Sequence, residues 1–195
     1  MKFIRNLLAT VGLITILLLA AVSPRIYAVK SRLAEFDPKA WDTYVEMFEK
    51  ILETGNAADA TVWRAKVTEG LSFEDVDETI LFVANELNIK NVGELPLYKQ
   101  VESMSGKPYR YVKIYMFCNA LTAARMLDYS DAFGAYLPCR ISLIEDKQGQ
   151  LWIYTLNMDP MIHGGLPLPP ALKEEALQVK AIMQDILKRG AIGEF

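Results

Sequence analysis

The amino-acid sequence predicts an α+β fold, a two-layer sandwich in which helices cover one face of a mainly antiparallel sheet. Two observations carry this prediction. Segments with the alternating pattern of strands are interleaved with segments whose apolar residues recur every three to four positions. Several strands follow one another across short turns, which favours antiparallel pairing, and helices gathered on one side of such a sheet make two layers.

Residues 1–28 differ in composition from the rest of the chain and are predicted to be a signal peptide or an N-terminal membrane anchor. Lys2 and Arg5 precede a long uncharged apolar run. This run is longer than the apolar core of most signal peptides but shorter than a typical membrane span of about 20 residues, so both alternatives stay open. As an anchor the segment would use residues 6–24, whereas cleavage would follow Ala28.

Either alternative places the folded part of the chain outside the cytoplasm, in the periplasm or another extracytoplasmic space, secreted or tethered to the inner membrane. The whole chain has a net charge of −3, and cleavage after Ala28 would remove three more basic residues and bring it to −6. Nucleic-acid binding requires a positive surface, so we expect no nucleic-acid partner. We expect contact with a membrane only through the N-terminal segment.

Residues 29–58 are predicted to form an N-terminal helical extension that contains a helix over 37–55. Asp37 is a good N-cap, Pro38 suits the first helical position, and Gly55 suits the position after the last turn. Apolar side chains recur along this helix at helical spacing, and we expect them to pack against the domain. These side chains are Trp41, Val45, Phe48 and Leu52.

The α+β domain is predicted to span residues 59–195 and to begin with a strand over 61–67, which is rich in β-branched and aromatic residues. A helix follows from Ser72, because Asp75 three positions later approximates a capping box. The buried face of this helix is expected to consist of Val76, Ile80, Val83 and Leu87.

A second strand is expected over residues 109–118, where the two faces differ in character. One face carries Val112, Ile114, Met116 and Cys118. The other face carries Tyr109, Tyr111, Tyr115 and Phe117. A two-layer fold leaves one sheet face without helices. This aromatic face, with Trp152 and Tyr154, is therefore either an exposed ligand or partner surface or packed beneath the N-terminal helix.

The second half of the domain is predicted to contain a short helix capped by Asn119, a hairpin over 139–157 with Gly149 in its turn, and a final helix. Pro170 suits the start of the final helix and Gly190 suits its end. The inward side chains of this helix are expected to be Leu172, Ala176, Val179, Met183 and Ile186.

The stretch 117–160 resembles the signature region of the domain of unknown function 302 family. The matching features are Cys118–Asn119 at a strand end, a short Ala-rich helix, and the Leu-Pro-Cys-Arg block 137–140, followed by a strand and an acidic hairpin. The resemblance covers about residues 61–160. It implies a sandwich similar to the TATA-binding-protein fold, a homodimer, and no established reaction.

Cys118 and Cys139 are open to three interpretations. In an exported protein two cysteines suggest a disulfide bond, which would stabilise the fold by about 3 kcal/mol in the chain-entropy model. Each cysteine also continues an apolar strand face, where packed free thiols are common. The two do not form a Cys-x-x-Cys motif, which disfavours a redox pair. A thiol–disulfide redox protein using both is nevertheless the alternative function.

Other catalytic chemistry is disfavoured by the small number of reactive side chains. Two cysteines and one histidine make three soft ligands, whereas a structural zinc site normally has four. A single histidine also allows at most one Ser–His or Cys–His pair. The sequence therefore predicts a non-enzymatic ligand-binding or accessory module, with a purely structural interaction domain as a further alternative.

The single histidine, His163, follows two methionines and precedes two glycines. It is the candidate axial ligand for a haem iron, and its alternative is an exposed or hydrogen-bonded loop residue. No Cys-x-x-Cys-His motif is present, so covalent attachment is excluded. The predicted ligand is haem b or another apolar planar molecule at a dimer face, and some exported members of the resembling family are suspected to bind haem. The candidate binding residues are His163, Met158, Met161, Tyr115, Phe117, Trp152 and Tyr154.

Overall fold

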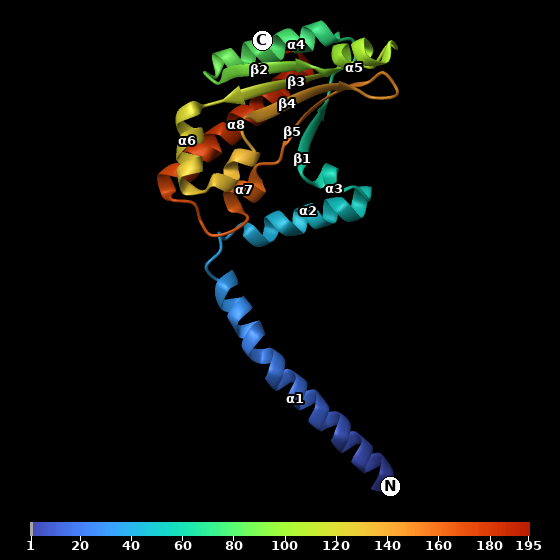
Figure 1. The fold of residues 1–195 in the computed structure, drawn as a ribbon, viewed down its shortest axis with the longest axis vertical. Helices are drawn as coiled ribbons and strands as arrows, with labels where there is room; N and C mark the ends of the chain where they lie inside the picture. The colour runs from blue at the N-terminus through green and yellow to red at the C-terminus, as the bar shows by residue number, and fades with distance from the viewer. Residues whose placement is uncertain (1) are drawn as a thin grey trace.

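The computed structural model describes residues 2–195, except for the side chains of residues 18, 19 and 26. It contains one five-stranded sheet in the order β1-β5-β4-β3-β2, and every neighbouring pair is antiparallel (Figure 1). The strands are β1 (Val62–Lys66), β2 (Lys90–Pro96), β3 (Val112–Cys118), β4 (Cys139–Glu145) and β5 (Leu151–Leu156).

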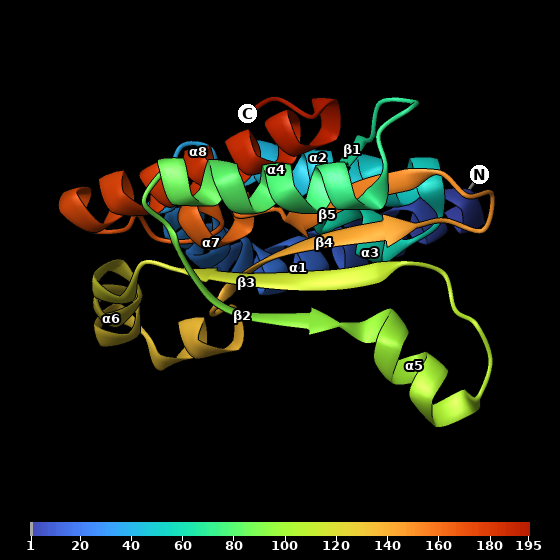
Figure 2. The same cartoon turned by 90° about the horizontal axis from the view of Figure 1, so that it is seen from above.

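Two long helices, α4 (Phe73–Glu86) and α8 (Pro170–Ile192), pack against each other and lie on the same side of the strands (Figure 2). The predicted α+β sandwich with helices on one face is therefore confirmed. The other helices are α1 (Lys2–Leu33), α2 (Ala40–Thr54), α3 (Ala57–Ala60), α5 (Leu97–Ser105), α6 (Ala120–Tyr129), η1 (Asp131–Ala135, a 3₁₀ helix) and α7 (Asp159–His163). The sequence patterns do not predict α3, α5, η1 or α7.

One hydrophobic core fills the space between the sheet and the two long helices. The sheet contributes five fully buried side chains: Tyr115, Phe117, Ile141, Leu143 and Ile153. The inward faces predicted for the two helices are confirmed, because all their members are buried except Leu87, which is half-buried.

The expectation of an exposed aromatic sheet face is wrong for β3. Tyr115 and Phe117 lie in the core beneath α4 and α8, not on the free face and not beneath the N-terminal helix. Trp152 pairs with Ile144 rather than with a core residue, and it lies with Tyr154 on the opposite, half-exposed face of the sheet. Alternation along a strand separates its two faces but does not tell which of them the helices cover.

The helix caps predicted at Ser72 and Asn119 and the turn predicted at Gly149 are confirmed. Ser72 and Asp75 form a complete capping box, and the Asn119 side chain accepts a hydrogen bond from the Thr122 amide at the start of α6. Gly149 lies in the hairpin turn with φ of 83°. The predicted end of the last helix is wrong, because α8 continues through Gly190 to Ile192.

The N-terminal extension contains a helix as predicted, but α2 begins at Ala40 after Lys39, so the expected Asp37 N-cap and Pro38 first position are wrong. Its apolar stripe also does not face the domain. α2 ends at Gly55, which has the left-handed φ of 67° that favours glycine. Trp41, Phe48 and Leu52 keep 71%, 60% and 70% of their surface exposed. The buried residues of α2 are Ala40 and Thr43 on another face. The expectation that the stripe packs on the domain is therefore wrong.

α1 is a single apolar helix of 32 residues whose most apolar window has a mean hydropathy of 2.3, and none of its described side chains is buried in the protein. It is long and apolar enough to cross a membrane, which is compatible with either a signal sequence or an anchor. Cleavage after Ala28 and an extracytoplasmic location of the domain stay predictions.

Gly190 allows α8 to approach the sheet closely, since an added Cβ would lie 2.9 Å from Ile153 Cδ1 and 3.1 Å from Ile80 Cγ1. Both isoleucines are fully buried and have no room to move. We expect Gly190→Val to lower the free energy of unfolding by about 2 kcal/mol through overpacking. Urea denaturation of the full-length chain in detergent measures this.

The matched control is Ala181→Val on the exposed side of α8. It adds a β-branched residue to the same helix without entering the core, and should cost less than about 1 kcal/mol. Equal losses of stability in the two variants would contradict a close contact at Gly190.

Candidate ligand-binding site

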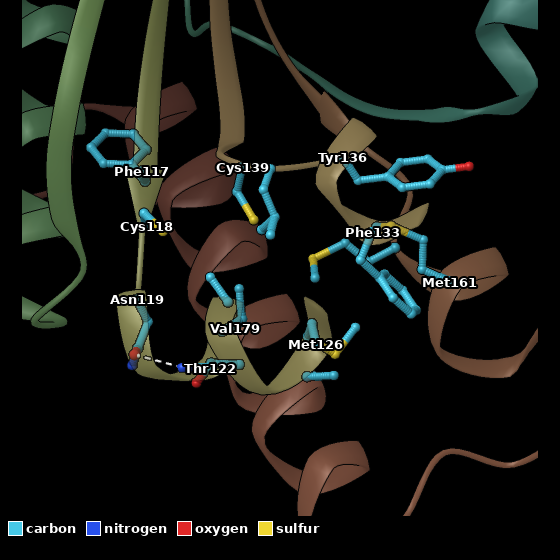
Figure 3. Close-up of a pocket in the computed structure, with 14 residues that line it drawn as sticks. Phe117, Cys118, Asn119, Thr122, Met126, Phe133, Tyr136, Cys139, Met161 and Val179 are labelled. Atoms are coloured by element: carbon cyan, nitrogen blue, oxygen red, sulfur yellow. Dashed lines mark hydrogen bonds between the residues drawn. The ribbon is translucent and has the colours of Figure 1, made fainter. Parts of the chain in front are cut away.

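Two hollows meet at the end of the sheet where β3 ends and β4 begins. The smaller is a cavity of about 50 Å³, here called the thiol cavity, and Figure 3 shows the side chains that surround it. The larger is a groove of about 490 Å³, here called the aromatic groove. Phe133, Tyr136 and Met161 line both hollows and form the wall between them.

The chain between β3 and β4 builds one side of both hollows. It forms α6 directly after β3 and then η1, and it returns through a cis Leu137–Pro138 peptide bond. α6 is fastened to α8, because Thr122 and Arg125 both donate hydrogen bonds to Glu175 Oε2, at 3.0 Å and at 2.7–2.9 Å. The wall of the hollows is therefore held against the domain rather than left as a free loop.

The aromatic groove is bounded by α2, by Thr61 just before β1, by the end of α6 with η1, by the end of β5, and by α7 with the turn after it. Tyr44 of α2 donates a hydrogen bond of 2.6 Å from its hydroxyl to the Gly164 carbonyl, which holds α2 beside the groove. The aromatic side chains in the groove are Tyr44, Tyr129, Phe133 and Tyr136.

The size of each hollow limits what it can accept. A volume of about 490 Å³ lies in the range of small-molecule sites. The thiol cavity, at about 50 Å³, has room for an ion or a few water molecules but not for an organic cofactor such as haem. Of these two hollows, the groove is therefore the one with room for a planar organic ligand.

Sulfur atoms concentrate around the thiol cavity, where Cys118 and Cys139 are joined by three methionines, Met126, Met158 and Met161. Thiols and thioethers are the ligands that soft metal ions prefer. Within residues 2–195, no group of three or more His, Cys, Asp and Glu side chains is arranged to hold a metal.

The two cysteines are free thiols. Of the two structural alternatives, a disulfide bond and packed thiols, the structure therefore has the packed thiols. Burial, and to a smaller extent the neighbouring Cys118, raises the pKa of the Cys139 thiol to about 11. A thiol with so high a pKa is almost entirely protonated at neutral pH and is a poor nucleophile. The raised pKa of the Cys139 thiol therefore does not favour the redox alternative.

His163 is buried, and its side chain keeps only 4% of its surface exposed. Its Nδ1 lies 3.2 Å from Asp37 Oδ1, and its Nε2 lies 4.0 Å from Asp159 Oδ1. Both ring nitrogens are thus directed at carboxylates, and His163 lines neither hollow. Axial ligation of haem by His163 stays a prediction that this arrangement does not support, and the hydrogen-bonded alternative describes the residue better.

Asp37 is the centre of the polar cluster that contains His163. Its carboxylate, 1% exposed, accepts a hydrogen bond of 2.9 Å from the Lys39 amide and also binds the Lys173 ammonium group. Burial by itself would raise the pKa of Asp37, but the hydrogen bonds from Lys173 and Lys39 outweigh it and hold the pKa below its ordinary value. In the same cluster Asp159 binds Lys180 of α8.

The structure brings some of the predicted site residues together and separates others. Five of them surround the thiol cavity: Phe117, Cys118, Cys139, Met158 and Met161. Tyr115 is a core residue whose hydroxyl donates a hydrogen bond of 2.5 Å to Asp77. Trp152 donates from its indole N–H to Asp146 at 3.0 Å, on the other face of the sheet with Tyr154.

The aromatic residues of the groove are absent from the candidates chosen on sequence. A signal for three of them is present in the sequence, because Tyr129, Phe133 and Tyr136 recur at intervals of four and three in the short stretch from the end of α6 to β4. Tyr44 has no such signal, since its contact with Gly164 joins residues 120 positions apart.

Comparison with known proteins identifies the domain. A family model described as "Domain of unknown function DUF302" matches residues 64–190. An "Uncharacterized protein" of Aquifex aeolicus (strain VF5) is 26% identical over 133 residues, which cover 68% of this chain and 85% of that protein. The "Crystal structure of uncharacterized conserved protein DUF302 from Bacillus stearothermophilus" aligns with a TM-score of 0.54 and 19% identity, covering 66% of this chain and 97% of that chain. This last likeness shows a shared fold alone.

We expect Asp37→Asn to lower the free energy of unfolding by about 2–3 kcal/mol at pH 7, because it removes the negative partner of Lys173 and His163. The pKa of Asp37 is lowered in the folded state. Its stabilisation is therefore full above the unfolded value of about 3.9 and is lost as the pH falls through the folded value. Urea denaturation at pH 7 and pH 3 should show the difference between the two proteins shrinking in acid.

The exposed Asp128 of α6 provides the control, and Asp128→Asn should change stability by no more than about 0.5 kcal/mol at either pH. An Asp37→Asn deficit that is equally large at pH 3 would mean that lost packing, not lost charge, is responsible.

Cys139 should react slowly with iodoacetamide in the folded protein, and its rate should rise about tenfold per pH unit from pH 7 towards pH 10, because only the thiolate is alkylated. Peptide mass spectrometry separates Cys139 from Cys118. In urea the rate should level off near the ordinary thiol pKa of about 8.5. The same levelling in the folded protein would contradict a raised pKa.

Proposed function

Because the chain belongs to the DUF302 family, whose description assigns no activity, we propose a function from the site itself: a non-enzymatic module that binds a small apolar planar molecule in the aromatic groove. The single observation that carries the proposal is the groove, about 490 Å³ in volume and walled by the rings of Tyr44, Tyr129, Phe133 and Tyr136. Aromatic side chains bind planar apolar ligands through stacked and edge-to-face contacts.

The polar groups of the groove would orient a ligand rather than react with it. Ser130 and Asn157 line the groove beside its apolar side chains, and Gly164 and Gly165 form part of its floor. A few polar groups among apolar side chains are typical of small-molecule sites. No member of this set is a nucleophile paired with a base, which favours binding over catalysis.

Haem b is one planar molecule of the proposed class. The sequence predicts haem ligation by His163, but haem in the groove would lie beside Met161, because Met161 lines the groove and His163 does not. The predicted homodimer and extracytoplasmic location remain parts of the proposal, with α1 as the segment that would export or anchor the chain.

Native mass spectrometry of the full-length chain released from detergent tests the proposal, with N-phenyl-1-naphthylamine as an apolar planar probe. The variant Ala132→Trp adds a large side chain to η1 in the groove, whereas Ala124→Trp adds the same side chain to the exposed surface of α6. We expect Ala132→Trp to weaken binding at least about tenfold, or about 1.4 kcal/mol, and Ala124→Trp to leave it unchanged.

Equal binding by both variants would exclude the aromatic groove as the site. Hemin is the second probe, used with His163→Ala. Hemin uptake that is retained in the folded variant agrees with binding in the groove, whereas uptake lost together with the visible spectrum would restore His163 as an axial ligand.

A further inference from the structure

α2 has three distinct faces. Ala40 and Thr43 are buried, and Met47 faces the aromatic groove. A second face, here called the α2 stripe, consists of Trp41, Val45, Phe48 and Leu52, which recur at helical spacing and of which all but Val45 are exposed. A third face carries the carboxylates Asp42, Glu46, Glu49 and Glu53.

The α2 stripe exposes more apolar surface than a soluble helix normally leaves in water. Trp41, Phe48 and Leu52 keep 71%, 60% and 70% of their surface exposed. Contiguous exposed apolar patches of this kind mark contact sites for a partner or a membrane.

α2 is not part of the family domain. The family match begins at residue 64, after α2 has ended at Thr54, and α4 and α8 already cover the helix-bearing face of the sheet. The domain core therefore does not require the α2 stripe, which is part of the N-terminal extension.

The position of α2 points to what covers the stripe. α1 ends at Leu33 and α2 begins at Ala40, so the six residues between them span no more than about 20 Å. Within this link Asp37 is fixed to the domain, because its amide donates to the Gly165 carbonyl at 2.8 Å. Figure 1 shows α2 at the end of the domain from which α1 departs.

Charges around the link fit a lipid headgroup region. Lys30 and Arg32 lie in the last turn of α1 and Lys39 directly precedes α2, so three positive charges flank or lie in the link, which also carries Glu35 and Asp37. Positive side chains that flank a spanning helix bind lipid phosphates, and Trp and Tyr rings favour the same depth. The carboxylates of α2 occupy their own face, where they would remain in water.

We propose that the chain is retained in the membrane by α1 and that α2 lies flat in the interface of that membrane, with the α2 stripe buried among the lipid headgroups and upper acyl chains. Amphipathic helices bind in this way, with the apolar face immersed and the charged face in solution. The domain is then held at a defined orientation to the bilayer through Asp37. This inference does not depend on what the aromatic groove binds.

Fluorescence of the full-length chain in phosphatidylcholine vesicles tests the proposal, with a lipid brominated on its acyl chain near the headgroup as quencher. The chain has three tryptophans, and Trp63 and Trp152 lie on the sheet. We expect the brominated lipid to quench the wild-type emission and Trp41→Phe to abolish the quenching. Absent quenching, or quenching unchanged in Trp41→Phe, overturns the proposal.

The matched pair Leu52→Asp and Leu121→Asp separates this contact from a general effect of surface charge. Both leucines are 70% exposed, one on α2 and one on α6, so neither variant is expected to unfold the chain. Leu52→Asp should reduce quenching of Trp41 by at least half, while flotation shows that α1 still holds the chain in the vesicles. The tryptophan emission of Leu121→Asp should be quenched to the same extent as that of the wild type.

A second copy of the chain is the competing occupant of the α2 stripe. Sedimentation in detergent would then show a dimer that Leu52→Asp dissociates, with no quenching of Trp41 in vesicles. That combination of results rejects the membrane contact and assigns the stripe to self-association.

Discussion

The buried carboxylate of Asp37 is the contact on which the arrangement of the N-terminal extension depends. A carboxylate that is 1% exposed is stable only when it is paired, and here its partners come from two other parts of the chain, His163 at the end of α7 and Lys173 on α8. The neighbouring pair Asp159–Lys180 ties α7 to α8 as well. These contacts set where α2 begins, and so set one wall of the aromatic groove.

This dependence explains why α2 participates in two different surfaces. Its Tyr44 and Met47 line the groove, and its Trp41, Phe48 and Leu52 remain exposed on another face. The family domain is a complete sandwich without it, because α4 and α8 already close the core. The extension therefore adds to the domain both a boundary for a ligand site and an apolar surface beside a helix that is able to cross a membrane.

The side chains that look most reactive in the sequence, His163 and Cys139, have surroundings typical of structural rather than reactive groups. His163 is directed at two carboxylates, and the Cys139 thiol has its pKa raised to about 11, chiefly by burial. Cys139 begins β4 and His163 ends α7. The carboxylates of Asp37 and Asp159 lie beside the ring nitrogens of His163, and α6 and η1 line the thiol cavity together with the two cysteines.

Local chemistry was sufficient to predict the long helices and most of the strands of this protein, although not the short helices α3, α5, η1 and α7, because a cap or an apolar period acts within a few residues. The capping box at Ser72, the inward face of α8 and the apolar α1 follow from such patterns. Which face of an element is covered depends on segments far away in the chain. Only the tertiary structure therefore showed that Tyr115 is buried, that the stripe of α2 is exposed, and that Tyr44 meets Gly164 across 120 residues to bound the groove.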